Sequence, residues 1–348
     1  MQNDQIKTKI CLFCPVCGSR GGILYSGLED LLFDAPGAWN MKKCNSPVCG
    51  TLWLDPMPVE DELPKLYKGY YTHQSGSAPL SEGYLLALFH RVQAAYLHFR
   101  YGYEPLATSW VDKLLGLAAY LYPAWKDTVE ASVFHLQAKP GGRLLEIGCG
   151  SGAVLQLMQQ KGWCVTGLDF DEGAVHNARS KGLDVHFGQL SEQGFADQTF
   201  DAVVMSHVIE HVPSLVEFLS ECRRVLKDEG VLVALTPNAD SSLHIKYGRY
   251  WRGLEIPRHL QIFTSQSLAN IAGRVGFSMV ETSTAMNGFV YQDLSSRELA
   301  AGENHVMGGT VSPVRRILSH MKAFVLGWRR LLFPGHCGGE EVVLVCRR

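Results

Sequence analysis

From residue 143 onward, short apolar runs alternate with longer stretches whose apolar residues repeat at helical spacing. The short runs suit buried strands, and the stretches between them suit amphipathic helices. Strands separated by helices predict right-handed βαβ units and hence an α/β fold with a doubly wound, mostly parallel sheet. The expected strands are 143–148, 164–169, 184–187, 200–206, 231–236 and the tail 340–348, and the expected helices lie near 152–161, 172–181 and 213–227.

A glycine-rich loop, "LEIGCGSGA" at 145–153, follows the first of these strands. It fits both the G-x-G-x-x-G/A pattern of dinucleotide-binding folds and an acidic-x-G-x-G-x-G pattern. Glu146 separates the two, because a carboxylate there repels a pyrophosphate but suits the ammonium and sulfonium groups of S-adenosylmethionine. Asp169, at the end of the second strand, can bond two ribose hydroxyls of either ligand. S-adenosylmethionine is therefore the expected cofactor, and a nicotinamide dinucleotide is the alternative.

Five of the ten cysteines lie within residues 11–49. "CPVCG" contains Cys14 and Cys17, and "CNSPVCG" contains Cys44 and Cys49, which are two residues further apart than in the usual CxxC pair. Two thiolate pairs, each followed by a glycine, supply the four ligands of a structural zinc, and a closed Cys₄ site leaves no position for a substrate. Cys11 is a fifth candidate ligand, and a set of unligated buried thiols is the alternative.

Three segments resemble, in order, the motifs of class I S-adenosylmethionine-dependent methyltransferases over roughly residues 140–285: "LLEIGCGSGAVLQLMQQKGWCVTGLDFDEGAVHNARSKGL", "FDAVVMSHVIEHV" and "ECRRVLKDEGVLVALTPN". The cysteine pairs before them and "YWRGLEIPRHLQIFT" (250–264) after them are similar to a bacterial subgroup with an N-terminal zinc-binding region. Members of that subgroup are often associated with methylation of sugars, polysaccharides or natural products. The resemblance implies a cofactor site formed by Glu146, Gly148, Cys149, Gly150 and Gly152 around the methionine portion, Asp169 at the ribose, Phe170, Gln189 and Leu190 at the adenine, and Ser206 and His207 beside the methyl-donor pocket.

The motif "HVIEH" (207–211) follows the fourth expected strand, at the edge where ligands bind. His207 and His211 are candidate catalytic bases, because histidine titrates near neutral pH, and Glu210 is a candidate catalytic residue that can orient them. The spacing also resembles a Glu-x-x-Glu-His arrangement of ubiquinone-pathway O-methyltransferases, where it is linked to a divalent cation, with His207 in place of the first carboxylate. The alternative is that these residues only cap the strand end.

A second motif, "EIPRHL" (255–260), lies after the fifth expected strand, where substrate contacts usually arise. Arg258 can bind a carboxylate or phosphate as a fork, and His259 is a further candidate base. Tyr250, just before this motif, is another candidate substrate contact. The alternative is that Arg258 and His259 form structural salt bridges.

The pattern divides the chain into a zinc ribbon (1–58), a linker with a helical lid (59–135) and a methyltransferase domain (136–348) with a helical insertion at about 286–340. Residues 82–135 are expected to be helical, either facing a core or covering a hydrophobic substrate. In 314–333, apolar residues recur at helical spacing among five basic ones. This helix is expected to pack on its own domain, with peripheral contact to a membrane surface or a lipid-linked substrate as the alternative.

The formal charge of −2, from 32 basic and 34 acidic residues, gives no general attraction to nucleic acid. The clustered cysteines and the lack of a signal-peptide pattern or a bilayer-long apolar run predict a cytoplasmic chain without a transmembrane segment. The predicted function is methyl transfer to a small molecule or a sugar or glycan, with oxygen the favoured acceptor atom and carbon or nitrogen as alternatives. Two rivals are an RNA methyltransferase, disfavoured by the few basic residues in 1–58, and a binding module without catalysis.

Overall fold

The computed structural model describes residues 6–67, 84–104, 109–302, 312–333 and 338–348. The chain forms two compact units. The first unit comprises Met1–Tyr70, Ser206–Arg223 and Ala234–Arg347, and the second comprises Tyr71–Met205, Arg224–Val233 and Arg348. Part of the expected linker, 68–83, lies outside the described residues, and the domain boundaries at 58 and 135 stay predictions.

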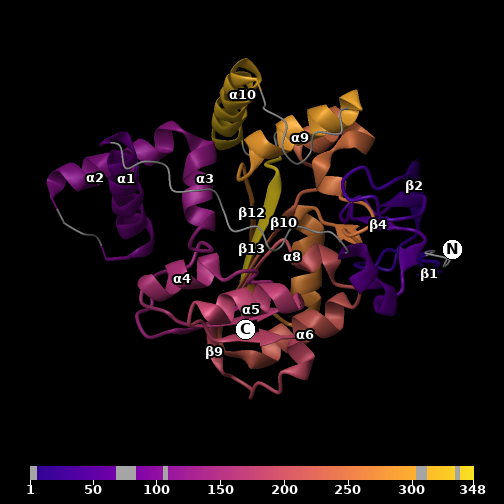
Figure 1. Ribbon diagram of the computed structural model, residues 1–348, viewed down its shortest axis with the longest axis horizontal. Coiled ribbons are helices and arrows are strands. Elements are labelled where there is room, and N and C mark those ends of the chain that lie inside the picture. Colours follow the sequence, from indigo (N-terminus) through magenta and orange to yellow (C-terminus); the bar gives the residue numbers. More distant parts are fainter. Residues whose placement is uncertain (1–5, 68–83, 105–108, 303–311, 334–337) are drawn as a thin grey trace. The chain divides into compact units, whose positions relative to one another are not determined.

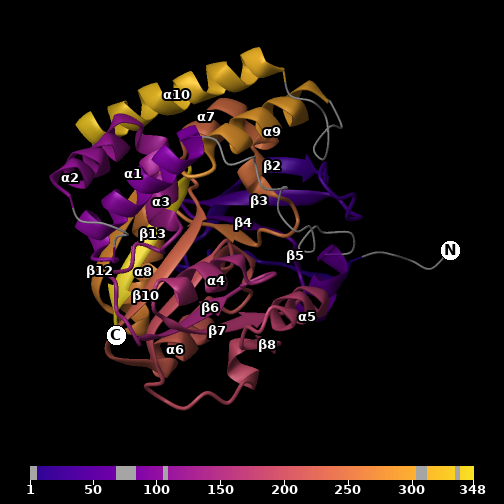
Figure 2. The same cartoon turned by 60° about the vertical axis from the view of Figure 1, so that its left-hand side comes forward.

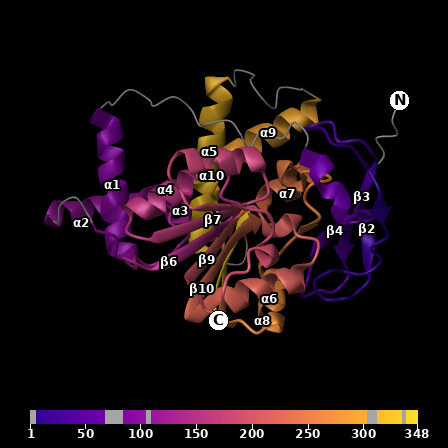
Figure 3. The same ribbon diagram turned by 60° about the horizontal axis from the view of Figure 1, so that its bottom comes forward.

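The second unit contains the parallel strands of the main sheet. In it, β6 (Arg143–Ile147) pairs in parallel with both β7 (Cys164–Asp169) and β9 (Phe200–Ser206) (Figure 3). β8 (Val185–Phe187) extends the sheet beyond β7. The helices α4 (Ala153–Gln160) and α5 (Glu172–Ser180) contact β7, and a 3₁₀ turn, η3 (Leu190–Glu192), follows β8. Leu144 and Leu145 of β6 are fully buried, as expected of a strand covered on both faces.

Three helices precede these strands in the second unit: α1 (Tyr84–Tyr101), α2 (Trp110–Leu117) and α3 (Pro123–Ala131), with a 3₁₀ turn, η2 (Ala118–Leu121), between the last two (Figure 1). α2 begins at a capping box in which Ser109 and Asp112 satisfy each other's backbone N–H groups. α1 is bonded to α3 because the Tyr96 hydroxyl donates to Glu130, which also pairs with Lys126. The helices expected within 82–135 are therefore present, and their role as a lid stays a prediction.

The cysteine-rich part of the first unit forms two small antiparallel sheets. β1 (Thr8–Lys9) pairs with β5 (Met57–Pro58), and a four-stranded sheet has the order β11-β4-β3-β2. Its strands are β2 (Gly21–Leu28), β3 (Trp39–Cys44), β4 (Leu52–Leu54) and β11 (Gln261–Ile262). β11 comes from a distant part of the sequence, so the ribbon is completed by residues outside 1–58. A 3₁₀ helix, η1 (Glu60–Tyr67), follows.

The rest of the first unit is built around β12 (Ser278–Ala285) and β13 (Glu341–Arg347), which pair antiparallel and are contacted by α8 (Ser265–Val275). The helices α7 (Ser242–Tyr247), α9 (Phe289–Ala301) and α10 (Pro313–Leu332) also belong to this unit (Figure 2). Asp293 of α9 joins the three, because it pairs with Lys246 of α7 and Lys322 of α10. The remaining elements of the unit are η4 (Ile209–His211), η5 (Gly248–Tyr250) and η6 (Arg252–Leu254).

Three of the described elements contribute residues to both units: β9, through Ser206, α6 (Leu215–Val225) and β10 (Leu226–Pro237). The strand order of the main sheet is β12-β13-β10-β9-β6-β7-β8, in which the ladders β9-β6, β6-β7 and β7-β8 are parallel. The predicted α/β fold with a mostly parallel sheet is confirmed, including the final strand. No helix in the described parts of the chain is long and apolar enough to cross a membrane.

Candidate functional site

The glycine loop after β6 adopts a conformation that depends on glycine. Gly152 lies at the start of α4 with a φ of 78°, and a Cβ built there would lie 2.3 Å from the Leu183 side chain. Gly150 also has a positive φ, but a Cβ built on it would meet no atom within 4 Å. The backbone at Gly150 therefore faces open space, as a ligand-binding loop requires.

Two buried carboxylates border this loop. Glu146 is 5% exposed, and its Oε2 has no hydrogen-bond partner among the described residues. Burial, and then the charge of Asp169, raise the pKa of Glu146 well above its usual value. Asp169 accepts hydrogen bonds from the backbone N–H groups of Gly150 (2.7 Å) and Asp171 (2.9 Å), while burial raises its own pKa. A buried carboxylate without a partner fits a cationic ligand group, which would remove the cost of burying it.

The structure places the other expected cofactor residues around the same strand ends. Cys149 is buried, and burial raises the pKa of its thiol. The Phe170 side chain is 53% exposed, so it is accessible to an aromatic ligand, whereas Leu190 is buried. Gln189 is exposed, and its backbone N–H donates to Glu192. These placements leave the assigned cofactor roles as predictions.

The first motif histidine, His207, lies just after β9 and bridges two buried carboxylates. Its Nδ1 is 3.2 Å from Glu210 Oε1, and its Nε2 is 2.9 Å from Glu341 Oε1. Partial desolvation of the ring is outweighed by the hydrogen bonds to Glu210 and Glu341, which raise the pKa of His207 well above the usual value. The imidazole is thereby held in its charged form, which has no lone pair to accept a proton. Its geometry favours a positioning role over the expected role of base.

His211 and His259 present a different arrangement. The Nδ1–H of His259 donates to the Gly253 carbonyl (2.8 Å), and Nδ1 of His211 lies 3.0 Å from the Arg258 carbonyl and 2.9 Å from the Tyr67 hydroxyl. A carbonyl can only accept, so in the neutral form of each ring we assign the proton to Nδ1, and Nε2 then carries the lone pair. Burial lowers the pKa of His259 to about 4, so this ring is neutral at pH 7.

Glu210 completes this cluster. It is fully buried, accepts a hydrogen bond from the Thr236 hydroxyl (2.9 Å), and lies 3.8 Å from His259 Nε2. Burial raises the pKa of Glu210, but the hydrogen bond from His207 outweighs it and lowers the pKa to about 2. Ligand atoms of Glu210, His211 and His259 lie within 4.8 Å of one another, so this set, and not one that includes His207, could hold a divalent metal.

Arg258 does not occupy the position expected of a substrate-binding fork. Its side chain is fully buried, and Nη1 and Nη2 each lie 2.9 Å from a carboxylate oxygen of Asp30. Its guanidinium also stacks over the ring of Phe33, 4.4 Å from the centroid. The geometry therefore favours the alternative that Arg258 forms a structural salt bridge, because Asp30 already contacts both terminal nitrogens of its guanidinium.

A pocket of about 370 Å³ lies beside this ion pair, within the first unit. The loop after β2 forms one wall and residues 249–256 form the other. Tyr250, a substrate contact predicted from the sequence, lines the pocket and is 39% exposed. Glu255 also lines it, with Oε2 3.9 Å from His259 Nε2, so the pocket adjoins the histidine cluster. Sequence reasoning missed Glu29, Arg249 and Arg252 in the lining, since no local motif links residue 29 with residue 249.

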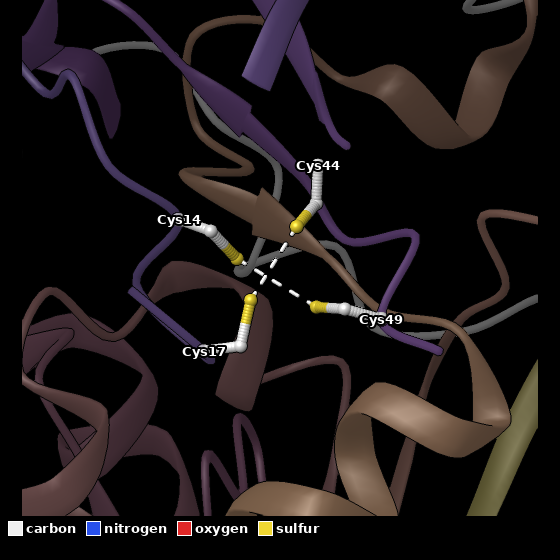
Figure 4. Close-up of side chains that lie close together, drawn as sticks. All are labelled: Cys14, Cys17, Cys44 and Cys49. Carbon is white, nitrogen blue, oxygen red and sulfur yellow. Dashed lines mark hydrogen bonds between the residues drawn. The ribbon is translucent and has the colours of Figure 1, made fainter. Parts of the chain in front are cut away.

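Four cysteines of the ribbon converge on one point (Figure 4). The Sγ atoms of Cys14 and Cys49 are 3.7 Å apart, and those of Cys17 and Cys44 are 3.4 Å apart. Zinc–sulfur bonds of about 2.3 Å place tetrahedral thiolates about 3.8 Å from one another, so these spacings fit a zinc ion. Cys11 is not in this cluster, and its Sγ lies 3.9 Å from the Lys9 carbonyl instead.

Parts of this chain are similar in sequence to known proteins. A family model described as a methyltransferase domain matches residues 117–282. A protein of Mycolicibacterium smegmatis named as a probable S-adenosylmethionine-dependent methyltransferase is 33% identical over 187 residues, which cover 48% of this chain and 72% of that protein. A ubiquinone biosynthesis O-methyltransferase of Pseudomonas aeruginosa is 28% identical over 149 residues, which are 41% of this chain and 55% of that protein. The chain thus spans about half the length of this second relative.

Among solved structures, a SAM dependent methyltransferase from Archaeoglobus fulgidus matches 67% of this chain and 94% of its own length, with a TM-score of 0.42 and 20% identity. The identity and coverage of the mycobacterial relative, together with the matched methyltransferase domain, show that this chain belongs to the S-adenosylmethionine-dependent methyltransferase family.

Proposed function

We propose that this protein transfers a methyl group from S-adenosylmethionine to a hydroxyl oxygen of a small molecule or a sugar. When bound, S-adenosylmethionine supplies a methyl group that leaves its sulfur as the acceptor oxygen bonds to it. The observation that carries the proposal is the buried Glu146 carboxylate, whose Oε2 has no partner among the described residues. The cationic methionine end of the cofactor supplies that partner, whereas a pyrophosphate would place further negative charge beside it.

The rest of the cofactor is assigned by the same reasoning. Asp169 holds the ribose, because its carboxylate is fixed by two backbone N–H groups and keeps lone pairs for hydroxyl donors. Phe170 stacks on the adenine, Gln189 and Leu190 border it, and Ser206 with His207 borders the methyl group. Exposure of the Phe170 ring supports its part in this assignment.

The acceptor binds in the pocket lined by Tyr250 and Glu255. Aromatic and charged side chains together suit a sugar-sized molecule, whose CH groups contact the ring while its hydroxyls bond the polar groups. The adjacency of Glu255 to His259 supports the position of the reacting hydroxyl near the histidine cluster.

His211 takes the proton that an acceptor hydroxyl must lose. Its Nε2 has the lone pair that this step needs, because Nδ1 is turned toward the Arg258 carbonyl and the Tyr67 hydroxyl. His259 is neutral, but its low pKa makes it a weaker base, and Glu210 stabilises the imidazolium that forms on His211. Arg258 positions the pocket wall and does not contact the acceptor.

The ribbon holds one structural zinc through Cys14, Cys17, Cys44 and Cys49. The four sulfur atoms use every tetrahedral position, so the ion orders the ribbon and takes no part in methyl transfer.

Calorimetry with S-adenosylhomocysteine and with NAD tests the cofactor assignment. We expect binding of the first and none of the second. Glu146→Gln should weaken binding of S-adenosylmethionine, which carries the sulfonium, more than binding of neutral-sulfur S-adenosylhomocysteine. Glu172→Gln, an exposed carboxylate of α5, is the matched control and should bind both ligands normally. Binding of NAD alone would overturn the proposal.

A further inference from the structure

Helix α10 carries basic residues and no acidic ones. Its sequence, "PVRRILSHMKAFVLGWRRLL", contains five arginines or lysines in 20 residues, while the chain as a whole has a formal charge of −2. The helix is therefore the one strongly cationic segment among the described helices, and the basic residues are Arg315, Arg316, Lys322, Arg329 and Arg330.

The helix packs on its own unit through its smallest side chains. Ser319, Ala323 and Gly327 recur every four residues and are buried, and α10 contacts α9 (Figure 2). The Lys322 ammonium, on the same side, reaches the buried Asp293 carboxylate of α9 at 3.0 Å. Because small residues face the protein, the large apolar residues of α10 lie on the outer face.

These outer residues form one continuous stripe. At 100° per residue they span an arc of about 140°. Their exposed fractions range from 42% to 64%, and they are Val314, Ile317, Leu318, Met321, Phe324, Val325, Leu331 and Leu332. Apolar side chains of this size and number are rarely left in water by a protein that has no partner for them.

We propose that α10 is a peripheral membrane-docking helix that lies in the plane of an anionic lipid surface. The apolar stripe enters the boundary between headgroups and acyl chains, and Arg316 and Arg329, which lie beyond its two edges, contact lipid phosphates. Charge selects this occupant over a second copy of the chain, because two α10 helices placed face to face would bring like charges together. The inference does not depend on the proposed methyl transfer.

Vesicle co-sedimentation of the full chain tests the proposal. The probes are vesicles of three parts phosphatidylcholine to one part phosphatidylglycerol, and vesicles of phosphatidylcholine alone. We expect binding to the anionic vesicles that weakens as salt is raised, and much weaker binding to the neutral ones. Met321→Gln/Val325→Gln, in the centre of the stripe, should weaken binding at least about tenfold. The matched control, Ile23→Gln/Ile245→Gln, removes two exposed apolar residues outside α10 and should bind like the unchanged chain.

The electrostatic part is tested by Arg316→Gln/Arg329→Gln, which should lower affinity for the anionic vesicles about 30-fold, since each basic residue contributes about fivefold. Circular dichroism should show unchanged helix content in every variant. Failure to bind anionic vesicles, or equal binding by the stripe variant and its control, would overturn the proposal. A dimer in light scattering that only the stripe variant dissociates would identify a second copy as the occupant and overturn it as well.

Discussion

Arg258 and Asp30 form a two-pronged ion pair in which both side chains are fully buried. Asp30 also accepts hydrogen bonds from three backbone N–H groups of its own loop, and Arg258 donates to the Leu66 carbonyl. The pair ties the loop after β2 to the segment before β11, and Asp30 itself lines the pocket. Arg258, a substrate contact predicted from the sequence, thus helps to hold one wall of this pocket in place.

Breaking this pair should destabilise the protein. Asp30→Ala removes the carboxylate that contacts both terminal nitrogens of the buried Arg258 guanidinium, and the loss of such a buried contact typically costs about 3–5 kcal/mol. The free energy of unfolding in urea measures the loss. Glu29→Ala, the neighbouring exposed residue, is the matched control and should change stability by less than about 0.5 kcal/mol. An Arg258→Met variant that keeps full stability but loses affinity for the acceptor would instead restore Arg258 as a substrate contact.

Glu340 should make stability depend on pH. It is fully buried, its Oε1 accepts a hydrogen bond from Ser242, and its Oε2 has no partner among the described residues. Burial raises its pKa from 4.5 to about 7, so the folded state holds this proton more tightly than the unfolded state does. The contribution of Glu340 to stability is therefore greatest below about pH 4.5, falls between pH 4.5 and 7, and above that window is lower by about 3 kcal/mol.

Glu340→Gln removes that titration, so the variant should gain stability over the unchanged protein as pH rises from 5 to 8. Urea unfolding across this range checks the difference. Glu281→Gln, at an exposed position on β12, provides the control, and its difference from the unchanged protein should stay constant with pH. A constant difference for Glu340→Gln would mean that the buried carboxyl is already ionised at pH 5.

The zinc assignment predicts one metal ion per chain. Elemental analysis of the purified protein should find it, and Cys14→Ser/Cys17→Ser should abolish it with loss of ribbon stability. Cys11→Ser and Cys164→Ser should both retain the metal, because Cys11 lies outside the cluster and Cys164 lies in the second unit. A second equivalent of metal that disappears in His259→Ala would reveal occupancy of the Glu210, His211 and His259 set.

Histidine variants separate proton transfer from positioning. His211→Ala should bind S-adenosylmethionine normally and turn over about 10²–10⁴-fold more slowly, since it removes the proposed base. His207→Asn introduces a residue that tolerates the positive φ of 54° at this position, but it removes the imidazole that contacts Glu210 and Glu341. Because His207 is expected to position these groups, turnover should fall less than in His211→Ala. The assay uses methyl-labelled cofactor and the acceptor identified from a panel of sugars and hydroxylated small molecules. Near-normal turnover of His211→Ala would exclude it as the base.

Local pattern in the sequence determined the elements around the cofactor loop. Alternation of apolar runs with amphipathic stretches is a property of neighbouring residues, so it located β6, β7 and β9 and the helices between them. The two cysteine pairs were visible for the same reason, since each lies within one tight turn closed by a glycine of positive φ. The preference for S-adenosylmethionine over a dinucleotide as the expected cofactor also came from local spacing, because Glu146 lies two residues before Gly148 of the loop.

Tertiary structure decided which distant residues contact one another, and such contacts cannot be predicted from the spacing of residues along the chain. Glu341 bonds His207 across 134 positions, and this contact helps to raise the pKa of His207, which favours a positioning role. The sequence predicted that the Arg258 guanidinium binds a ligand, because nothing in the local sequence reveals its actual partner, Asp30, which lies 228 positions away. Helical periodicity showed that α10 is amphipathic, but only packing decided that its small residues face inward and its large apolar residues face out, because both faces satisfy the same 3.6-residue repeat.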